Sequence, residues 1–566
     1  MSEPLPMTVD QPKELLARLF KTSDSKKVID RSAIELIAKT RIPPPPPGHS
    51  SSDAAKYLEE LIRAVTAEII ASHSGYGYVR WLWYLRRIPT ALFAGTYSTT
   101  TAYDMALAET LCSSFDKQDT AENPDRIRFK IDDSTVRHIS RLVGAVRVLS
   151  QLHTAYRCIG KGATLDLTHA WPLWHASAPI RDAMRIYDSR HDAIQTMELR
   201  GLGIANASAD AQSLERGLEA GMVKEMFLFI RSSEYRAPVN APDQHGQLRD
   251  QTVAASYALS ALSLERLLDP YNIAPAISTP AYVAELEPLI ILLMLWPAFA
   301  AKMPWTLASA LQTGYFFTRE SEFRRLFEFW SPDLVAILQK SHPSIPWNAD
   351  YASWRARLAA LVPSQWPLRP STAVREYGQA LLIDVATASS AILTRARSDR
   401  TQSELANSRA FAFELQVQSI IDASSWKPSE DLSAVRGRTL RIDGKAVTDI
   451  DAIGFERDAL LLVSCKSIIY DDDYDRGVFR VVRNVQDTVD NAVANWSKIL
   501  ATLRAHPLGD NYDFTKVKSM VGVVCTPYVA YTSASETLAD VIDGLRACVA
   551  ASELALWLNR ANDAPE

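Results

Sequence analysis

Apolar residues recur every three or four positions through most of residues 53–400, and this spacing predicts helices. The first clear run has its apolar side chains at Tyr57, Leu58, Leu61, Ile62, Val65 and Ile69. A second run, from Val136 to Leu149, has the same spacing. Segments that alternate apolar and polar residues are scarce here, and Gly and Pro fall between the periodic runs. We therefore expect residues 53–400 to form an all-α region of one or two domains.

The preceding residues, 1–52, are polar and end in the proline run RIPPPPPGHSSSD. Consecutive prolines exclude both a helix and a central strand, so the run should form a stiff polyproline II spacer. The serines and Asp53 that follow are typical of a helix N-cap. We expect a flexible N-terminal segment with a proline-rich linker, followed directly by a helix.

The pattern changes after residue 400, where short β-like segments lie between helices. The expected elements are a helix at 403–423, strands at 438–442, 447–455 and 459–469, a helix at 481–504, a strand at 519–527 and a helix at 535–559. The helix between the third and fourth strands would be a crossover, which favours a mixed sheet covered by helices. We therefore predict a C-terminal α/β domain at 401–566 and, for the whole chain, a multidomain α+β fold.

The composition is ordinary for a globular protein, with 47% hydrophobic and 22% charged residues. A length of 566 residues exceeds what one hydrophobic core usually supports. The net charge of −5 provides no general attraction to nucleic acid, so a nucleic-acid surface would have to be local. The five cysteines have no CxxC spacing and no neighbouring His pair, which argues against a zinc site or a disulfide framework.

No part of the sequence predicts contact with a membrane. The N-terminus lacks a basic stretch followed by an apolar one, which a secretory signal would need. The most apolar run, 289–301, is too short to span a bilayer and contains Pro297, so we expect a buried helix there. These features indicate a cytoplasmic protein.

One helical segment, GYGYVRWLWYLRR at 75–87, combines aromatic and arginine side chains. Aromatic rings stack on bases and arginines hold phosphates, so this segment could contact nucleic acid. The aromatics also have helical spacing, however, which favours a buried helix with arginines along its edge.

Charged residues interrupt the apolar strands in VTDIDAIGFERDALLLVSCKS, residues 447–467. Because side chains alternate along a strand, Asp449 and Asp451 should share one face, as should Ser464 and Lys466. A two-residue Arg-Asp turn would set Asp451 opposite Ser464 and Asp449 opposite Lys466. That pair is not a favoured turn sequence, but a turn two residues longer would still leave all four side chains on one face.

An isolated charge in a hydrophobic sheet is costly unless it is paired or binds a metal. Hard divalent cations prefer carboxylate oxygens, and a nearby lysine can orient water or offset charge on a phosphate. Two acids and a lysine on adjacent strands therefore suit metal-assisted hydrolysis of a phosphodiester. A buried ion pair beside a solvated strand end explains the same spacing without catalysis.

In the order of its elements and residues, this part of the chain resembles the PD-(D/E)xK, or restriction-endonuclease-like, nuclease superfamily. The metal-binding aspartate of the family maps onto Asp451 in TDIDAIG, and its lysine maps onto Lys466 in VSCKS. The glutamate of the first helix maps onto Glu414 in FAFELQV, and Gln486 in RNVQDTVDN fits the glutamine of the helix after the lysine. The resemblance covers about 400–530. It implies Mg²⁺ or Mn²⁺ as cofactor, held by Asp451 and Glu414 with Asp449 close by.

Ser464 departs from the family pattern, because it stands where the second acid of (D/E)-x-K is expected. A hydroxyl is a weak, neutral metal ligand. One subgroup of restriction enzymes looks similar, since it carries Ser here and takes its second carboxylate from a later helix. The candidates for such an acid in this chain are Glu414, Asp487 and Asp490, with Asp449 also close.

The resemblance implies a metal-dependent endonuclease that acts on DNA in preference to RNA, in restriction or antiviral defence. The helical region would recognise the substrate or restrain the nuclease, and the protein could form a homo-oligomer or bind a regulatory protein. The alternative is a catalytically inactive module of nuclease fold that binds nucleic acid or protein, because members of the superfamily that have lost catalysis retain the fold as a scaffold.

Overall fold

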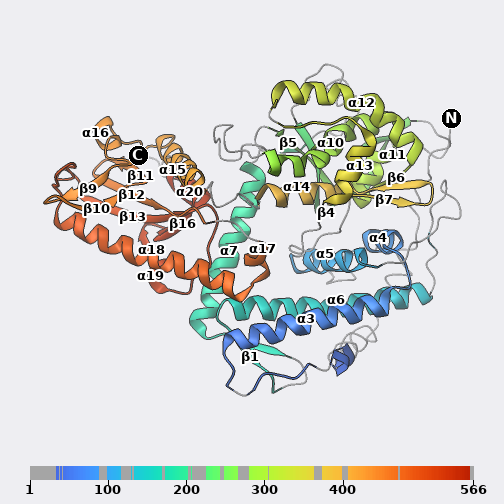
Figure 1. The fold of residues 1–566 in the computed structure, drawn as a ribbon, viewed down its shortest axis with the longest axis horizontal. Helices are drawn as coiled ribbons and strands as arrows, with labels where there is room; N and C mark the ends of the chain where they lie inside the picture. The colour runs from blue at the N-terminus through green and yellow to red at the C-terminus, as the bar shows by residue number, and fades with distance from the viewer. Residues whose placement is uncertain are drawn as a thin grey trace.

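The computed structural model describes residues 34–36, 38–40, 42–46, 48–87, 99–115, 129, 133–168, 172–201, 205–206, 225–242, 248–264, 280–303, 305–343, 345–361, 373–397, 406–468 and 472–560 (Figure 1). The fold is a mixture of helices and sheets, with a mixed sheet in the C-terminal part, as the sequence predicts. Most of the expected N-terminal segment and the predicted boundary near residue 400 lie outside the described residues.

The first part of the chain is helical. Its elements are α3 (Ser51–His73), α4 (Tyr78–Arg87), α5 (Thr99–Ser113), α6 (Asp133–Gly160), a short hairpin of β1 (Thr164–Asp166) and β2 (Leu173–His175), and α7 (Ala178–Gly201). The helix α3 begins as expected, since the Ser50 hydroxyl accepts a hydrogen bond from the Asp53 N–H at 3.2 Å. The Asp53 carboxylate accepts one from the Ser50 N–H in return. This capping box satisfies two N–H groups that a helix start otherwise leaves free.

The expectation that residues 53–400 are all-helical is wrong, because the described part of this region contains two three-stranded sheets in addition to the β1–β2 hairpin. The long strands β4 (Glu225–Pro242) and β5 (Leu248–Ser263) pair antiparallel, with β3 (Ala205–Asn206) on the other side of β5. A second sheet consists of β6 (Phe316–Arg319), β8 (Ala380–Ile383) and β7 (Val374–Tyr377). The start of β4 reads MFLFI, and a strand covered on both faces gives such a continuous apolar run. Periodicity alone does not separate that run from a buried helix.

Helices pack around these two sheets. They are α10 (Pro280–Lys302), α11 (Trp305–Thr313), α12 (Glu320–Ser341), α13 (Tyr351–Ala360) and α14 (Val385–Arg397). The apolar run at 289–301 lies in α10 and is buried, as expected from the sequence. Among the described residues, no helix is both long enough and apolar enough to cross a bilayer.

The C-terminal part contains a four-stranded sheet in the order β11-β12-β13-β16. Its strands are β11 (Ala452–Glu456), β12 (Ala459–Cys465), β13 (Ser519–Thr526) and β16 (Cys548–Ala550). The first two are antiparallel and the other pairs are parallel, so the sheet is mixed, as predicted. The crossover helix α18 (Phe479–Ala505) covers one face, while α15 (Ala406–Asp422) and α20 (Ala551–Arg560) cover the other.

Smaller elements complete this domain, and two expected elements differ. The remaining elements are α16 (Glu430–Ser433), β9 (Thr439–Ile442), β10 (Lys445–Asp449), α17 (Asp472–Arg476), α19 (Ser535–Leu538), β14 (Asp540–Ile542) and β15 (Leu545–Arg546). The expected strand at 447–455 is divided between β10 and β11. The expected helix at 535–559 is a helix only from Ala551, because β14, β15 and β16 precede it.

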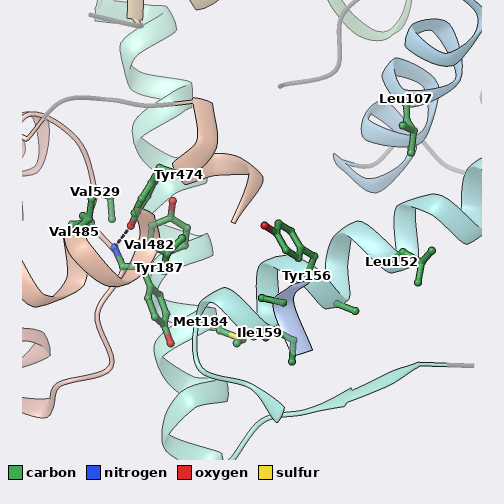
Figure 2. Close-up of a cluster of buried hydrophobic side chains, with 14 of the residues drawn as sticks. Leu107, Leu152, Tyr156, Ile159, Met184, Tyr187, Tyr474, Val482, Val485 and Val529 are labelled. Carbon is green, nitrogen blue, oxygen red and sulfur yellow. Dashed lines mark hydrogen bonds between the residues drawn. The ribbon is translucent and has the colours of Figure 1, made fainter. Parts of the chain in front are cut away.

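The helices α3 to α7 share one continuous hydrophobic core with the α18 face of the C-terminal sheet. Figure 2 shows Tyr187 of α7 beside Tyr474 of α17 and Val482 of α18. The Tyr474 hydroxyl accepts a hydrogen bond from the Tyr531 N–H at 2.6 Å, which is the dashed line in Figure 2. Residues 226–392 contribute to a second, separate core. The start of the chain is therefore packed against the C-terminal domain, although more than 200 residues lie between them in sequence.

The segment at 75–87 is core, as its helical spacing favours. Trp81, Trp83 and Tyr84 of α4 are buried. Arg86 is buried as well and donates to both carboxylate oxygens of Glu109 in α5, at 3.0 and 2.9 Å. It also donates to both oxygens of Asp384, which precedes α14, at 2.8 and 2.9 Å. Arg86 therefore connects the N-terminal helices to the part of the chain that forms the second core.

A buried histidine of α6 predicts that the protein loses stability in acid. Burial lowers the pKa of His153 from 6.5 to about 3, and the nearby Arg476 and Arg157 act in the same direction. The unfolded chain therefore binds a proton below about pH 6.5 that folded His153 does not accept until about pH 3. Stability conferred by the neutral ring is thus present above pH 6.5 and lost as the pH falls below it. We expect a loss of about 2 kcal/mol between pH 7 and pH 5 from this group.

Urea unfolding at pH 7 and at pH 5 measures this effect. His153→Gln should remove most of the difference between the two pH values, because the glutamine side chain does not titrate. His175→Gln is the control, since the side chain of His175 is 67% exposed. A His153→Gln protein that keeps the full pH dependence of the wild type would show that the assignment is incorrect.

Candidate active site

The β11–β12 hairpin has the register that the sequence predicts. Glu456 pairs with Ala459 beside a two-residue turn, and Ala452 pairs with Val463 at the far end. Arg457 in the turn has a φ of 58°, a left-handed conformation that is uncommon for arginine. One further step along the ladder sets Asp451 opposite Ser464. The Asp451 carboxylate accepts hydrogen bonds from the Cys465 N–H, at 2.6 Å, and from the Ser464 hydroxyl.

Lys466 lies directly after β12, at the carboxyl end of that strand. Its backbone N–H donates to the Cys525 carbonyl of β13 at 2.8 Å, so the parallel pairing continues to this residue. Along β12, Leu460 and Leu462 lie on the α18 side of the sheet, whereas Leu461 and Val463 face α15. Because side chains alternate along a strand, Ser464 continues the α18 side. The sheet therefore holds the backbone of Ser464 and Lys466 rigidly next to Asp451.

Glu414 reaches this site from α15. The helix packs Phe413, Val417 and Ile421 against the sheet. One turn after Glu414, the buried Gln418 accepts a hydrogen bond from the Ile453 N–H at 2.9 Å and donates one to the Ile453 carbonyl at 3.0 Å. Because β11 is an edge strand, these backbone groups have no partner strand on that side. Gln418 thus fixes α15 along the edge that carries Asp451.

The acids of the site are held in a partly buried and electrostatically unfavourable position. Burial raises the pKa of Glu414, and the Asp451 carboxylate raises it further, while Arg436 and Lys466 oppose this rise. Burial also raises the pKa of Asp451, against the Cys465 N–H and Lys466, which lower it. Glu414 lies on α15, Asp451 precedes β11 and Lys466 follows β12. The charges of Asp451 and Lys466 both shift the pKa of Glu414. The three predicted residues are therefore close enough to interact electrostatically, and their action as one site stays a prediction.

Gln418 and Arg436 were not predicted from the sequence. Gln418 lies among the apolar positions of α15, in ELQVQSII, and a polar residue there is the signal that could have revealed it. Arg436 lies between α16 and β9, and its charge lowers the pKa of Glu414. No sequence pattern singles out Arg436.

The predicted place of Asp449 is wrong. This residue ends β10 and pairs with Thr439 of β9 in a separate two-stranded sheet, so it does not lie opposite Lys466. The chain leaves the strand after Asp449 because the Ile450 carbonyl accepts a hydrogen bond from the Gly437 N–H at 2.9 Å. Asp449 is exposed, but its charge still raises the pKa values of Glu414 and Asp451.

The polar residues of α18 are engaged elsewhere. Gln486 is buried, accepts a hydrogen bond from Arg483 at 3.1 Å and donates one to Ser533 at 3.1 Å. Asp490 accepts hydrogen bonds from two threonine hydroxyls, at 2.6 and 2.7 Å. Asp487 is exposed. Of the candidates for the second carboxylate, Glu414 is therefore the one whose pKa Asp451 raises, and the match of Gln486 to the family's glutamine stays a prediction.

The donor set suits Mg²⁺ in an open site. This ion usually takes one or two protein carboxylates and completes its shell with water and substrate phosphate. Glu414 and Asp451 are two such carboxylates, and the Cys465 N–H and the Ser464 hydroxyl orient the second of them. Within the described ranges, no three Asp, Glu, His or Cys side chains form a group that could enclose a metal. A bound ion would consequently keep most of its positions for water and substrate.

No protein-family model, curated protein or solved structure matches the chain. The fold and the site define an α+β protein in which Asp451 and Lys466, at the ends of two neighbouring strands, lie close to Glu414 of α15. Its chemistry is therefore inferred from this geometry.

Proposed function

We propose that the C-terminal domain is a metal-dependent nuclease that hydrolyses phosphodiester bonds at the site of Glu414, Asp451 and Lys466. The observation that carries the proposal is the geometry of the β11–β12 hairpin, which sets Asp451 beside Ser464 and Cys465, with α15 fixed along the same edge by Gln418. There the Asp451 carboxylate is close enough to raise the pKa of Glu414. Two anions held close in a partly buried place are unfavourable by themselves. A divalent cation offsets this repulsion, and the chain provides oxygen donors of the kind that Mg²⁺ or Mn²⁺ binds.

Each side chain has a distinct part in the proposed reaction. Glu414 and Asp451 hold the cation, and the Cys465 N–H and the Ser464 hydroxyl orient the Asp451 carboxylate. When bound, such an ion stabilises negative charge on a phosphoryl oxygen and lowers the pKa of a coordinated water. Lys466 acts electrostatically on both acids, and its ammonium group is proposed to offset charge on the scissile phosphate or to orient the attacking water.

The resemblance of the residue order to the PD-(D/E)xK superfamily supports a nucleic acid as substrate, with DNA proposed before RNA. A role in restriction or antiviral defence, a cytoplasmic location and a homo-oligomeric or regulatory partner stay predictions. The helices that pack against the α18 face are proposed to restrain the nuclease or to recognise its substrate.

The test is cleavage of plasmid DNA, single-stranded DNA and RNA by the full chain, with Mg²⁺ or Mn²⁺ and with EDTA. Glu414→Gln should lower the cleavage rate roughly 100-fold, which is the size of effect that loss of one electrostatic contact to a transition state has elsewhere. Asp487→Asn is the matched control, because it removes an exposed acid of α18 outside the site. Its rate should stay within twofold of the wild type. Equal losses in both variants would contradict the assignment of Glu414.

One observation favours the alternative of an inactive binding module. Ser464 replaces a carboxylate, and no third acid completes a metal cage among the residues that the structure describes. A wild-type protein that cleaves none of these substrates but retards DNA or RNA in a gel would support the module. Absence of both cleavage and binding would contradict any nucleic-acid function.

A further inference from the structure

A cavity of about 480 Å³ is lined by residues of α7 and of the end of the C-terminal domain. Its lining includes Arg185, Ser189, Arg190, Arg546, Glu553 and Trp557. None of these residues belongs to the candidate active site. The cavity therefore lies where the helical part of the chain meets α20 and the β14–β15 hairpin.

One arginine of the lining is fully paired. Arg190 donates to both carboxylate oxygens of Glu553, at 2.7 and 2.6 Å, and to the Cys548 carbonyl at 3.1 Å. Glu553 also accepts a hydrogen bond from the Ala550 N–H at 2.9 Å. This ion pair connects α7 to the start of α20. Its two charges neutralise each other, so the pair adds no net charge to the cavity lining.

The other two arginines leave positive charge in the cavity. The Nε of Arg546 is buried and has no hydrogen-bond partner in the described structure. Buried donors without a partner are costly and uncommon. Arg185 contacts Asp182 at 3.2 Å, but both side chains are largely exposed, at 80% and 64%, and such a surface pair is weak. The lining thus contains three arginines and one glutamate, so Arg185 and Arg546 leave an excess of positive charge that an anion could bind.

We propose that this cavity binds a nucleoside phosphate, with the phosphate held by Arg546 and Arg185. The planar guanidinium group matches the spacing of phosphate oxygens and donates two hydrogen bonds at once. The ring of Trp557 contributes apolar surface to the lining, on which a base can stack. A volume of 480 Å³ falls within the usual range of about 300–1,000 Å³ for small-molecule sites.

The position of the cavity means that a bound ligand would affect how α7 packs against the C-terminal domain. A nucleoside phosphate bound to Arg185 touches α7, and the same phosphate bound to Arg546 touches β15. Its binding would therefore stabilise the docking of the C-terminal domain against α7. This inference does not depend on the nuclease proposal, because binding is measured without any cleavage.

Isothermal titration calorimetry of the full chain tests the proposal. The titrants are the adenosine, guanosine, cytidine and uridine diphosphates, adenosine without phosphate, and inorganic pyrophosphate. At least one diphosphate should bind with a micromolar Kd, while adenosine and pyrophosphate should bind at least tenfold more weakly. Arg546→Gln should raise the Kd about 30-fold, as expected for a lost hydrogen bond to a charged group. Arg181→Gln, on α7 but outside the lining, should leave the Kd unchanged.

Three outcomes would overturn the proposal. They are the absence of binding by every diphosphate, an affinity for pyrophosphate equal to that of the best diphosphate, and a Kd that Arg546→Gln does not change. If Arg546→Gln fails to fold, Arg185→Gln gives the same test, because the exposed Arg185 side chain can be replaced without loss of packing. It should weaken binding at least fivefold, and an unchanged Kd would again contradict the site.

Discussion

Asp451→Asn is expected to lower the rate of metal-dependent cleavage roughly 100- to 1,000-fold without lowering the stability of the fold. Asparagine keeps the shape of the side chain and an oxygen that can accept the hydrogen bond from the Cys465 N–H. It removes the negative charge that a cation would need. Because burial raises the pKa of Asp451, the charged form is disfavoured in the folded protein, so a neutral replacement should leave the melting temperature unchanged or higher.

Cleavage rates and thermal melting of the same preparations decide between two interpretations of this acid. If Asp451 serves mainly as a structural ion pair with Lys466, the variant should melt at a clearly lower temperature. If it serves catalysis, activity is lost and the melting temperature is kept. Asp487→Asn, which should change neither quantity, is the control. An Asp451→Asn protein that keeps at least half of the wild-type rate would contradict the proposed site.

Arg86→Met is expected to destabilise the protein by about 3–5 kcal/mol, the usual effect of breaking a buried ion pair. Burial alone would lower the pKa of Arg86, but Asp384 and Glu109 hold it well above its ordinary value. The Arg86 and Asp384 side chains are only 3% and 0% exposed. Methionine fills similar space but leaves Asp384 buried without its cation and leaves Glu109 with only the longer contact to Arg231, at 4.0 Å. Unpaired buried charge is the main cost.

Urea unfolding at constant pH measures this change. Arg324→Met is the matched control, because Arg324 also pairs with a glutamate, at 2.7 Å, but the two side chains are 60% and 49% exposed. Exposed helix pairs contribute only about 0.3–0.5 kcal/mol. Adding Asp384→Asn to Arg86→Met should recover part of the lost stability, since it removes a buried carboxylate charge that has lost its cation. A loss below about 1 kcal/mol for Arg86→Met would contradict the role given to this buried network.

The hairpin that carries Asp451 and Ser464 was predictable because its determinants are local. Side chains alternate along strands, and the apolar runs on either side of Arg457 and Asp458 leave two residues for the turn. The buried run at 289–301 in α10 and the N-cap at Ser50 were predictable for the same reason.

Other features depend on contacts between distant segments, which a local pattern does not contain. Asp449 leaves the strand of Asp451 because Ile450 bonds to Gly437 and β10 pairs with β9. Glu414 reaches Asp451 because Gln418 bonds to the backbone of Ile453, 35 residues later. The strands β4 and β5 were missed because their apolar stretches have no period of two.

The core shared by the first helices and the α18 side of the sheet has a consequence for how this chain can be divided. Tyr474, Val482 and Val485 are buried partly by residues that precede position 200. Cutting the chain near residue 400 would expose a hydrophobic surface on each fragment, and exposed patches of this kind promote aggregation. The smallest unit that can be expressed separately is thus discontinuous, and combines the C-terminal domain with the helices α3 to α7.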